Sequence, residues 1–183
     1  MAWRALLVAA ISLALLADAA PAGAAKPVLK NGCKLVTNDE IKNLMGRKPV
    51  QKSGGPEGCM WRTRRPVFNG DNGRNAEDAN VELNAFKKLS DVKEFYDGLT
   101  KPNGANCGSA DPLLPTRRHV FGDQAHLTGC SHVIFRLGHF VGDVHTFTND
   151  VKEDSNADTR RTTSLTKIFV KRLRRYRCGS FCL

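Results

Sequence analysis

Five histidines lie close together in the C-terminal half of the sequence, and imidazole is the side chain that most often binds metal ions in proteins. They fall within 27 residues and are His119, His126, His132, His139 and His145. Their separations of 7, 6, 7 and 6 positions match neither the i, i+4 pair of a helical zinc site nor a close ligand pair on one strand. A metal site would depend on how strands pair, so the spacing alone predicts no metal and no other cofactor.

A smaller set within this cluster is the alternative. If the chain reverses at Gly138-His139, His132 and His145 face each other on neighbouring strands, and Asp143 joins them. That arrangement would suit an exported metal-dependent hydrolase built on the His119–His145 region. Surface histidines or hydrogen-bonded sheet histidines explain the same pattern without any function. Because the sequence has no Gly-x-Ser-x-Gly or similar nucleophile motif, we expect a protein that is not an enzyme.

The even number of cysteines predicts disulfide bonds, provided that the chain is exported. Six cysteines allow 15 connectivities. Sequential pairing is favoured because each neighbouring couple brackets a plausible structural unit: Cys33 with Cys59, Cys107 with Cys130, and Cys178 with Cys182. The alternative for Cys178-Gly-Ser-Phe-Cys182 is a redox-active or metal-binding pair, although its spacing is not the two-residue gap of thioredoxin-like sites.

The N-terminus has the three-part layout of a secretory signal peptide. Arg4 precedes an uncharged run of 13 residues, Ala5 to Ala17, and small residues precede a cleavage site that we expect near Ala24 or Ala25. The run is shorter than the roughly 20 residues of a membrane-spanning helix, and no transmembrane segment is expected. The predicted organisation is a signal peptide over 1–25, one domain over 26–177 and a short cysteine-containing tail over 178–183, in a secreted or periplasmic protein.

The positive charge of the chain predicts an acidic partner. Lysine and arginine number 28 against 18 acidic residues, which gives a formal net charge of +10. The cations expected to bind that partner are Arg62, Arg64, Arg65, Lys171, Arg174 and Arg175. Outside the cell, suitable partners are anionic lipid headgroups, phosphate-bearing wall polymers or acidic proteins. The alternative is that these charges only solvate the surface and complement a helix dipole. No finger, homeodomain or RNP-like motif predicts dedicated nucleic-acid recognition.

The elements that must position these side chains indicate an α+β domain. Helices are predicted after Thr37, whose spacing to Glu40 is that of a capping box, after Ser90 as N-cap, and over the amphipathic stretch around Leu165 to Tyr176. Strands are predicted over 59–64, 81–85, 126–128, 132–137 and 140–147. Residues 51–58 are expected to be irregular because of Ser53-Gly54-Gly55-Pro56, and residues 101–115 to form a long loop.

Several short motifs occur in a recognisable order along the chain. They are Cys33-Lys34-Leu35-Val36-Thr37 before a short helix that ends at Gly46, Cys59-Met60-Trp61, Gly122-Asp123-Gln124-Ala125 before a hairpin, and an amphipathic last helix. This layout resembles the bacterial exported family called domain of unknown function 3558, found mostly in secreted proteins and lipoproteins of actinobacteria. The resemblance covers most of the expected mature chain with short motifs.

The resemblance implies a fold but no activity. It implies one antiparallel sheet flanked by helices, an α/β/α sandwich of the PsbP/Mog1-like type, with a disulfide between Cys33 and Cys59. The chain departs from the family in three respects: it lacks a lipobox before Cys33, it has four further cysteines, and it is unusually basic. Membrane tethering is therefore not part of what the resemblance implies here.

Overall fold

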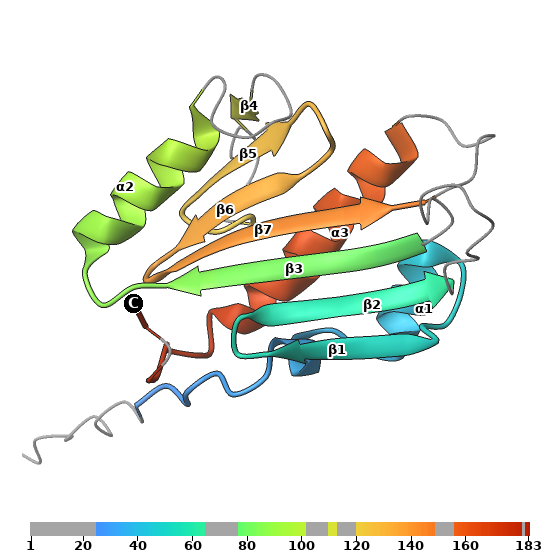
Figure 1. Ribbon diagram of the computed structural model, residues 1–183, viewed down its shortest axis with the longest axis horizontal. Coiled ribbons are helices and arrows are strands. Elements are labelled where there is room, and N and C mark those ends of the chain that lie inside the picture. Colours follow the sequence, from blue (N-terminus) through green and yellow to red (C-terminus); the bar gives the residue numbers. More distant parts are fainter. Residues whose placement is uncertain (1–24, 65–76, 102–109, 113–119, 149–155, 181) are drawn as a thin grey trace, which may run out of the picture.

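The computed structural model describes residues 25–64, 77–101, 110–112, 120–148, 156–180 and 182–183. The elements along the chain are η1 (Gly32–Leu35), α1 (Asn38–Met45), β1 (Gln51–Gly55), β2 (Gly58–Arg64), β3 (Glu77–Ala85), α2 (Leu89–Thr100), β4 (Ala110–Pro112), β5 (Gln124–Thr128), β6 (Val133–Leu137), β7 (Phe140–Phe147) and α3 (Asn156–Leu173). Figure 1 shows their arrangement. The predicted signal peptide lies outside the described residues. No helix within them has the length and apolar character needed to cross a bilayer.

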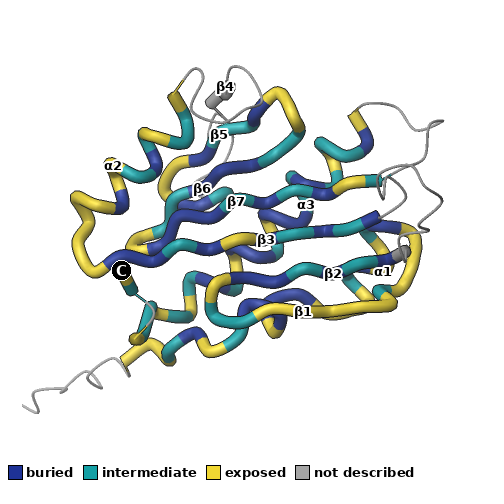
Figure 2. The backbone as a smooth tube through the Cα atoms, in the orientation of Figure 1, coloured by how far each residue is buried: buried dark blue, intermediate teal, exposed yellow. Residues whose placement is uncertain are grey.

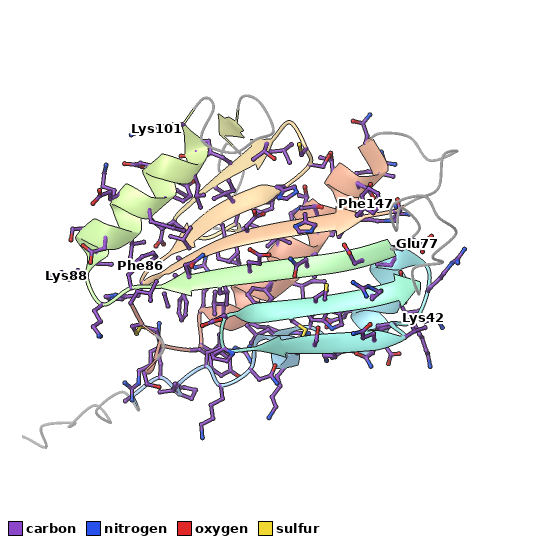
Figure 3. The ribbon with its side chains drawn as sticks, viewed as in Figure 1. Lys42, Glu77, Phe86, Lys88, Lys101 and Phe147 are labelled. Atoms are coloured by element: carbon purple, nitrogen blue, oxygen red, sulfur yellow. A yellow bond between two sulfur atoms is a disulfide. The ribbon has the colours of Figure 1, made fainter. Side chains whose placement is uncertain are left out.

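The described strands form one antiparallel sheet in the order β1-β2-β3-β7-β6-β5-β4. Two meanders, β1 to β3 and β4 to β7, meet where β3 pairs with β7 along almost their whole length. Figure 3 labels the ends of this central pair, with Glu77 and Phe147 at one end and Phe86 at the other. The predicted α+β class and antiparallel sheet are confirmed.

Strand alternation divides the side chains between the two faces of the sheet. On one face, Trp61, Phe135 and Val144 pack with residues of α3, α1 and η1 in the main core. On the other face, Ile134 and Val141 pack beneath α2 in a smaller cluster. Figure 1 views the molecule from this second face, with α3 behind the sheet. Helices therefore flank both faces, although α2 covers only the β6 and β7 side of its face.

The helix α1 begins as the sequence predicts. The Thr37 hydroxyl accepts a hydrogen bond from the Glu40 backbone N–H, and a Glu40 carboxylate oxygen accepts one from the Thr37 N–H. The same carboxylate accepts hydrogen bonds from the two terminal nitrogens, Nη1 and Nη2, of Arg172 in α3, at 2.7 and 2.6 Å. Arg172 also donates to the carbonyl of Leu35 at 2.8 Å. One arginine thus joins α3 to α1 and to η1.

Two expectations about local structure are wrong. Residues 51–55 form the edge strand β1 rather than an irregular segment, and its exposed positions are visible in Figure 2. Gly54 serves packing there, because a side chain at this position would meet the Gly58 carbonyl and the Cys33 sulfur. Ser90 does not cap α2: the helix starts after Lys88 without a side-chain cap, and the Ser90 hydroxyl donates to Asp91 instead.

The predicted loop over 101–115 is also interrupted, since the short strand β4 pairs with β5. The remainder of that loop, 102–109 and 113–115, lies outside the described residues. The backbone of Ala110–Pro112 pairs with the edge of β5, which would otherwise be open,. The local turn composition of this segment does not predict that pairing.

Two of the predicted disulfides are present in the described residues, Cys33 with Cys59 and Cys178 with Cys182. Cys130 is disulfide-bonded as well, while Cys107, its predicted partner, lies outside the described residues. Cys33 and Cys59 belong to the main core, so their bond fastens η1 to the β1–β2 hairpin. The disulfides are compatible with an extracytoplasmic protein.

Candidate functional site

His132, Asp143 and His145 converge on the face of the sheet that α2 partly covers. The strands β6 and β7 form a hairpin through Gly138, whose φ of 55° favours glycine,. Their register pairs Val133 with Val144, which places His132 opposite His145. Asp143 and His145 are two positions apart on β7 and therefore share a face. The structure thus brings together the three residues that the sequence named as the alternative metal set.

The three side chains are in contact range. The Nδ1 atom of His132 lies 3.0 and 3.2 Å from the two carboxylate oxygens of Asp143. The rings of His132 and His145 stack, with centroids 4.4 Å apart and planes 21° apart. One ligand atom from each of the three residues lies within 4.8 Å of the others. The exposed fractions of the His132 and Asp143 side chains, 29% and 34%, leave the group open to solvent.

The two stacked histidines have opposite protonation behaviour. The hydrogen bond to Asp143 raises the pKa of His132, and the charges of Asp143 and Glu82 add to this. Burial lowers the pKa of His145, and a positive charge on His132 lowers it further. As the pH falls, His132 therefore takes up a proton before His145, and the pair carries one positive charge over an intermediate range.

Two other histidines have structural partners. The Nδ1 atom of His126 on β5 lies 2.7 Å from the Tyr96 hydroxyl of α2. The Nδ1 atom of His139 lies 2.8 Å from the Phe86 carbonyl, where it can donate a hydrogen bond. These contacts hold α2 and the β6–β7 turn against the sheet. His119 lies outside the described residues.

Comparisons with protein-family models, with curated proteins and with solved structures found no match to this chain. The resemblance to domain of unknown function 3558 stays a prediction. The function is therefore inferred from the residues and their geometry.

The structure separates the basic residues that the sequence grouped together. Arg62 of β2 is half-buried on the sheet face opposite α3, where its guanidinium contacts Gln51 and lies near Asp78. The Arg64 side chain and the whole of Arg65 lie outside what the structure describes. Lys171 lies in the last turn of α3, and Arg174 and Arg175 directly follow this helix, on the other side of the sheet. A single patch that contains Arg62 and these three residues does not form.

A different basic group forms at the C-terminal end of α3. It includes residues that the sequence analysis did not name as partner-binding cations. Val28 pairs with Arg177 in a parallel bridge, and the Arg177 side chain donates to the Lys26 carbonyl at 2.9 Å. Figure 1 shows the blue N-terminal segment beside the red C-terminal segment. We call this group the terminal basic surface: Lys26, Lys171, Arg174, Arg175 and Arg177.

The terminal basic surface borders a hollow of about 480 Å³. Lys26, Arg174 and Arg177 line it together with apolar side chains such as Leu173 and Phe140 and with one carboxylate, Asp123. Lys171 and Arg175 are exposed neighbours of these residues in the sequence. Sequence reasoning did not find Lys26 because nothing local predicts the pairing of Val28 with Arg177.

Proposed function

We propose that the protein is a non-catalytic binding domain of the cell envelope whose terminal basic surface binds an acidic partner. The observation that carries the proposal is that three cations from two distant segments of the chain, Lys26, Arg174 and Arg177, line one hollow. Such a concentration of positive charge attracts polyanions at long range and holds them through several weak contacts.

The other observations agree with this proposal. The disulfides and the N-terminal sequence favour a secreted or periplasmic protein, with a signal peptide that is cleaved near Ala24 or Ala25,. Membership in domain of unknown function 3558 and a PsbP/Mog1-like sandwich are part of the same proposal. Arg172 does not belong to the binding surface, because Glu40 and Leu35 engage its guanidinium.

The test compares adsorption of the oxidised protein to sedimented envelope material at about 50 mM and about 500 mM salt. In the variant Arg174→Glu/Arg175→Glu, adsorption at low salt should fall at least tenfold, and the salt dependence should flatten because fewer counterions are released. A matched control is Lys42→Glu/Lys48→Glu, which changes the net charge equally on exposed positions of α1 and the segment after it. Figure 3 shows Lys42 at the other end of the molecule from the C-terminal segment.

Equal losses in both double variants would show that net charge alone governs adsorption and would contradict the assignment to the terminal basic surface. Adsorption of the unmodified protein that does not change with salt would contradict an acidic partner altogether.

A further inference from the structure

The uncovered face of β3 and β7 concentrates acidic side chains in a protein that is otherwise strongly basic. Asp143 is paired with Glu82 across the two strands, and His145 with Asn80. Asp78 lies two residues from Asn80 and therefore on the same face of β3. It interacts electrostatically with His145. Three carboxylates therefore surround two imidazoles although the chain as a whole carries a net charge of +10. A cation is the ligand that such a group attracts.

Charges of both signs act on this group. Arg62 is the cation that acts on Asp78 from β2. Glu82 and Asp143 interact electrostatically with both histidines. Figure 1 shows that none of the described helices stands in front of the middle of β3 and β7. Because the side chains of His132 and Asp143 are 29% and 34% exposed, an ion can reach the group from solvent.

The chemistry and the distances suit a metal ion of intermediate softness. Two imidazole nitrogens and one carboxylate oxygen form a ligand set that Zn²⁺ takes in open, three-residue sites, where water fills the remaining position. Bonds of about 2.1 Å place tetrahedral ligand atoms about 3.4 Å apart. Here these atoms lie within 4.8 Å of one another. Small rotations of the part-exposed side chains close that difference, while the paired strands hold their Cα positions.

We propose that His132, Asp143 and His145 bind one Zn²⁺ ion on this face of the sheet. The inference goes beyond the acidic-partner proposal, since the site lies on the sheet face that α3 does not cover. Binding requires that the hydrogen bond between His132 and Asp143 gives way, so that the Asp143 carboxylate and the two imidazoles can all ligate the ion,.

The test uses the oxidised protein, purified without a histidine tag, stripped with a chelator and titrated with Zn²⁺ against a fluorescent competitor. We expect one ion per chain with a dissociation constant below about 10 µM. His132→Asn and His145→Asn should each weaken binding at least tenfold, and Asp143→Asn about tenfold. His139→Asn is the matched control, because that histidine lies outside the group, and its affinity should equal that of the unmodified protein.

A second measurement needs no substitution. In two-dimensional spectra of the histidine ring nitrogens, Zn²⁺ should shift the signals of His132 and His145 and leave those of His126 and His139 in place. No binding by the unmodified protein up to about 100 µM Zn²⁺ would overturn the proposal. So would equal affinity in His132→Asn, His145→Asn and His139→Asn, or ring-nitrogen shifts confined to His126 and His139.

Discussion

Thr162 is a fully buried polar residue that fastens α3 to the sheet through hydrogen bonds. Its hydroxyl accepts a hydrogen bond from the Thr146 backbone N–H at 2.9 Å and lies 3.0 Å from the Thr146 hydroxyl. A buried backbone N–H that loses its partner is costly because water cannot replace that partner. This contact therefore contributes more to stability than the small size of the side chain suggests.

We predict that Thr162→Val lowers the free energy of unfolding by about 1 to 3 kcal/mol. The substitution keeps the shape of the side chain but leaves the Thr146 N–H without its acceptor. Urea denaturation measures the change. Thr163→Val is the matched control, because the Thr163 hydroxyl donates only to the Thr159 carbonyl within the same helix. Equal losses of unfolding free energy in the two variants would mean that the hydrogen bond between α3 and β7 stabilises the fold no more than the one within the helix.

His126 gives a second prediction at this scale. Burial lowers its pKa, so the unfolded chain takes up a proton at a pH where the folded protein resists it. Stability contributed by neutral His126 is present above the ordinary histidine pKa of about 6.5 and is lost as the pH falls below it. The melting temperature should therefore fall between about pH 7.5 and pH 5.5, and it should fall less steeply in His126→Asn.

The Tyr96 hydroxyl allows a check on this explanation. Burial raises the pKa of Tyr96, so the phenol remains protonated over the whole range. Tyr96→Phe removes the hydrogen bond but leaves His126 in place, and the decline with falling pH should remain. A pH dependence in His126→Asn that equals that of the unmodified protein would show that other groups cause the decline.

At the scale of elements, Arg172 and Glu40 join α3 to α1. Although burial acts to raise it, the pKa of Glu40 lies below its usual value because Arg172 and Thr37 hydrogen-bond to the carboxylate. A carboxylate of this kind stabilises the fold above its ordinary pKa of about 4.3. The contribution disappears as the pH falls and the group becomes protonated.

We predict that Arg172→Met destabilises the protein by about 1 to 2 kcal/mol at neutral pH, because the pair is two-pronged and partly buried. The variant should also lose less stability than the unmodified protein when the pH falls from about 5 to about 3. Lys93→Met is the control, since it removes the exposed pair with Asp97 within α2. Its denaturation midpoint should stay unchanged. A similar loss from both substitutions would contradict a bridging role for Arg172.

The elements also show which features the sequence can predict. The capping box of Thr37 and Glu40 depends on neighbours three residues apart, so α1 was predictable. The edge strand β1 was missed because its two glycines are typical of irregular segments, whereas Gly54 packs closely against Cys33 and Gly58 within the strand. The tight turn at Gly138 made the approach of His132 and His145 predictable. Glu82 and Asp78 join them only through the pairing of β3 with β7, for which the sequence has no local signal.

At the scale of the whole molecule, the disulfides connect segments of very different separation. Cys33 and Cys59 are 26 positions apart, and Cys178 and Cys182 only 4. A longer closed loop removes more freedom from the unfolded chain. The first pair is also buried in the main core, where its loss leaves a cavity.

We therefore predict that Cys33→Ala/Cys59→Ala costs about 3 to 4 kcal/mol and Cys178→Ala/Cys182→Ala about 2 kcal/mol. Guanidinium denaturation under non-reducing conditions measures both, after peptide mapping has confirmed the remaining bonds. The reverse order of the two losses would show that strain or residual structure, rather than loop closure and burial, sets the contribution of each bond.

The pairing of β3 with β7 has a consequence for the time course of folding. The hairpins β1–β2, β2–β3 and β6–β7 join neighbouring segments, and each can form early. The pairing that unites the two meanders must instead close the long chain segment between Ala85 and Phe140, and closing such a loop costs entropy before any contact offsets it. The β6–β7 hairpin brings His132, Asp143 and His145 together early, whereas Glu82 and Asp78 join them only in the later step, after most of the polypeptide has been synthesised.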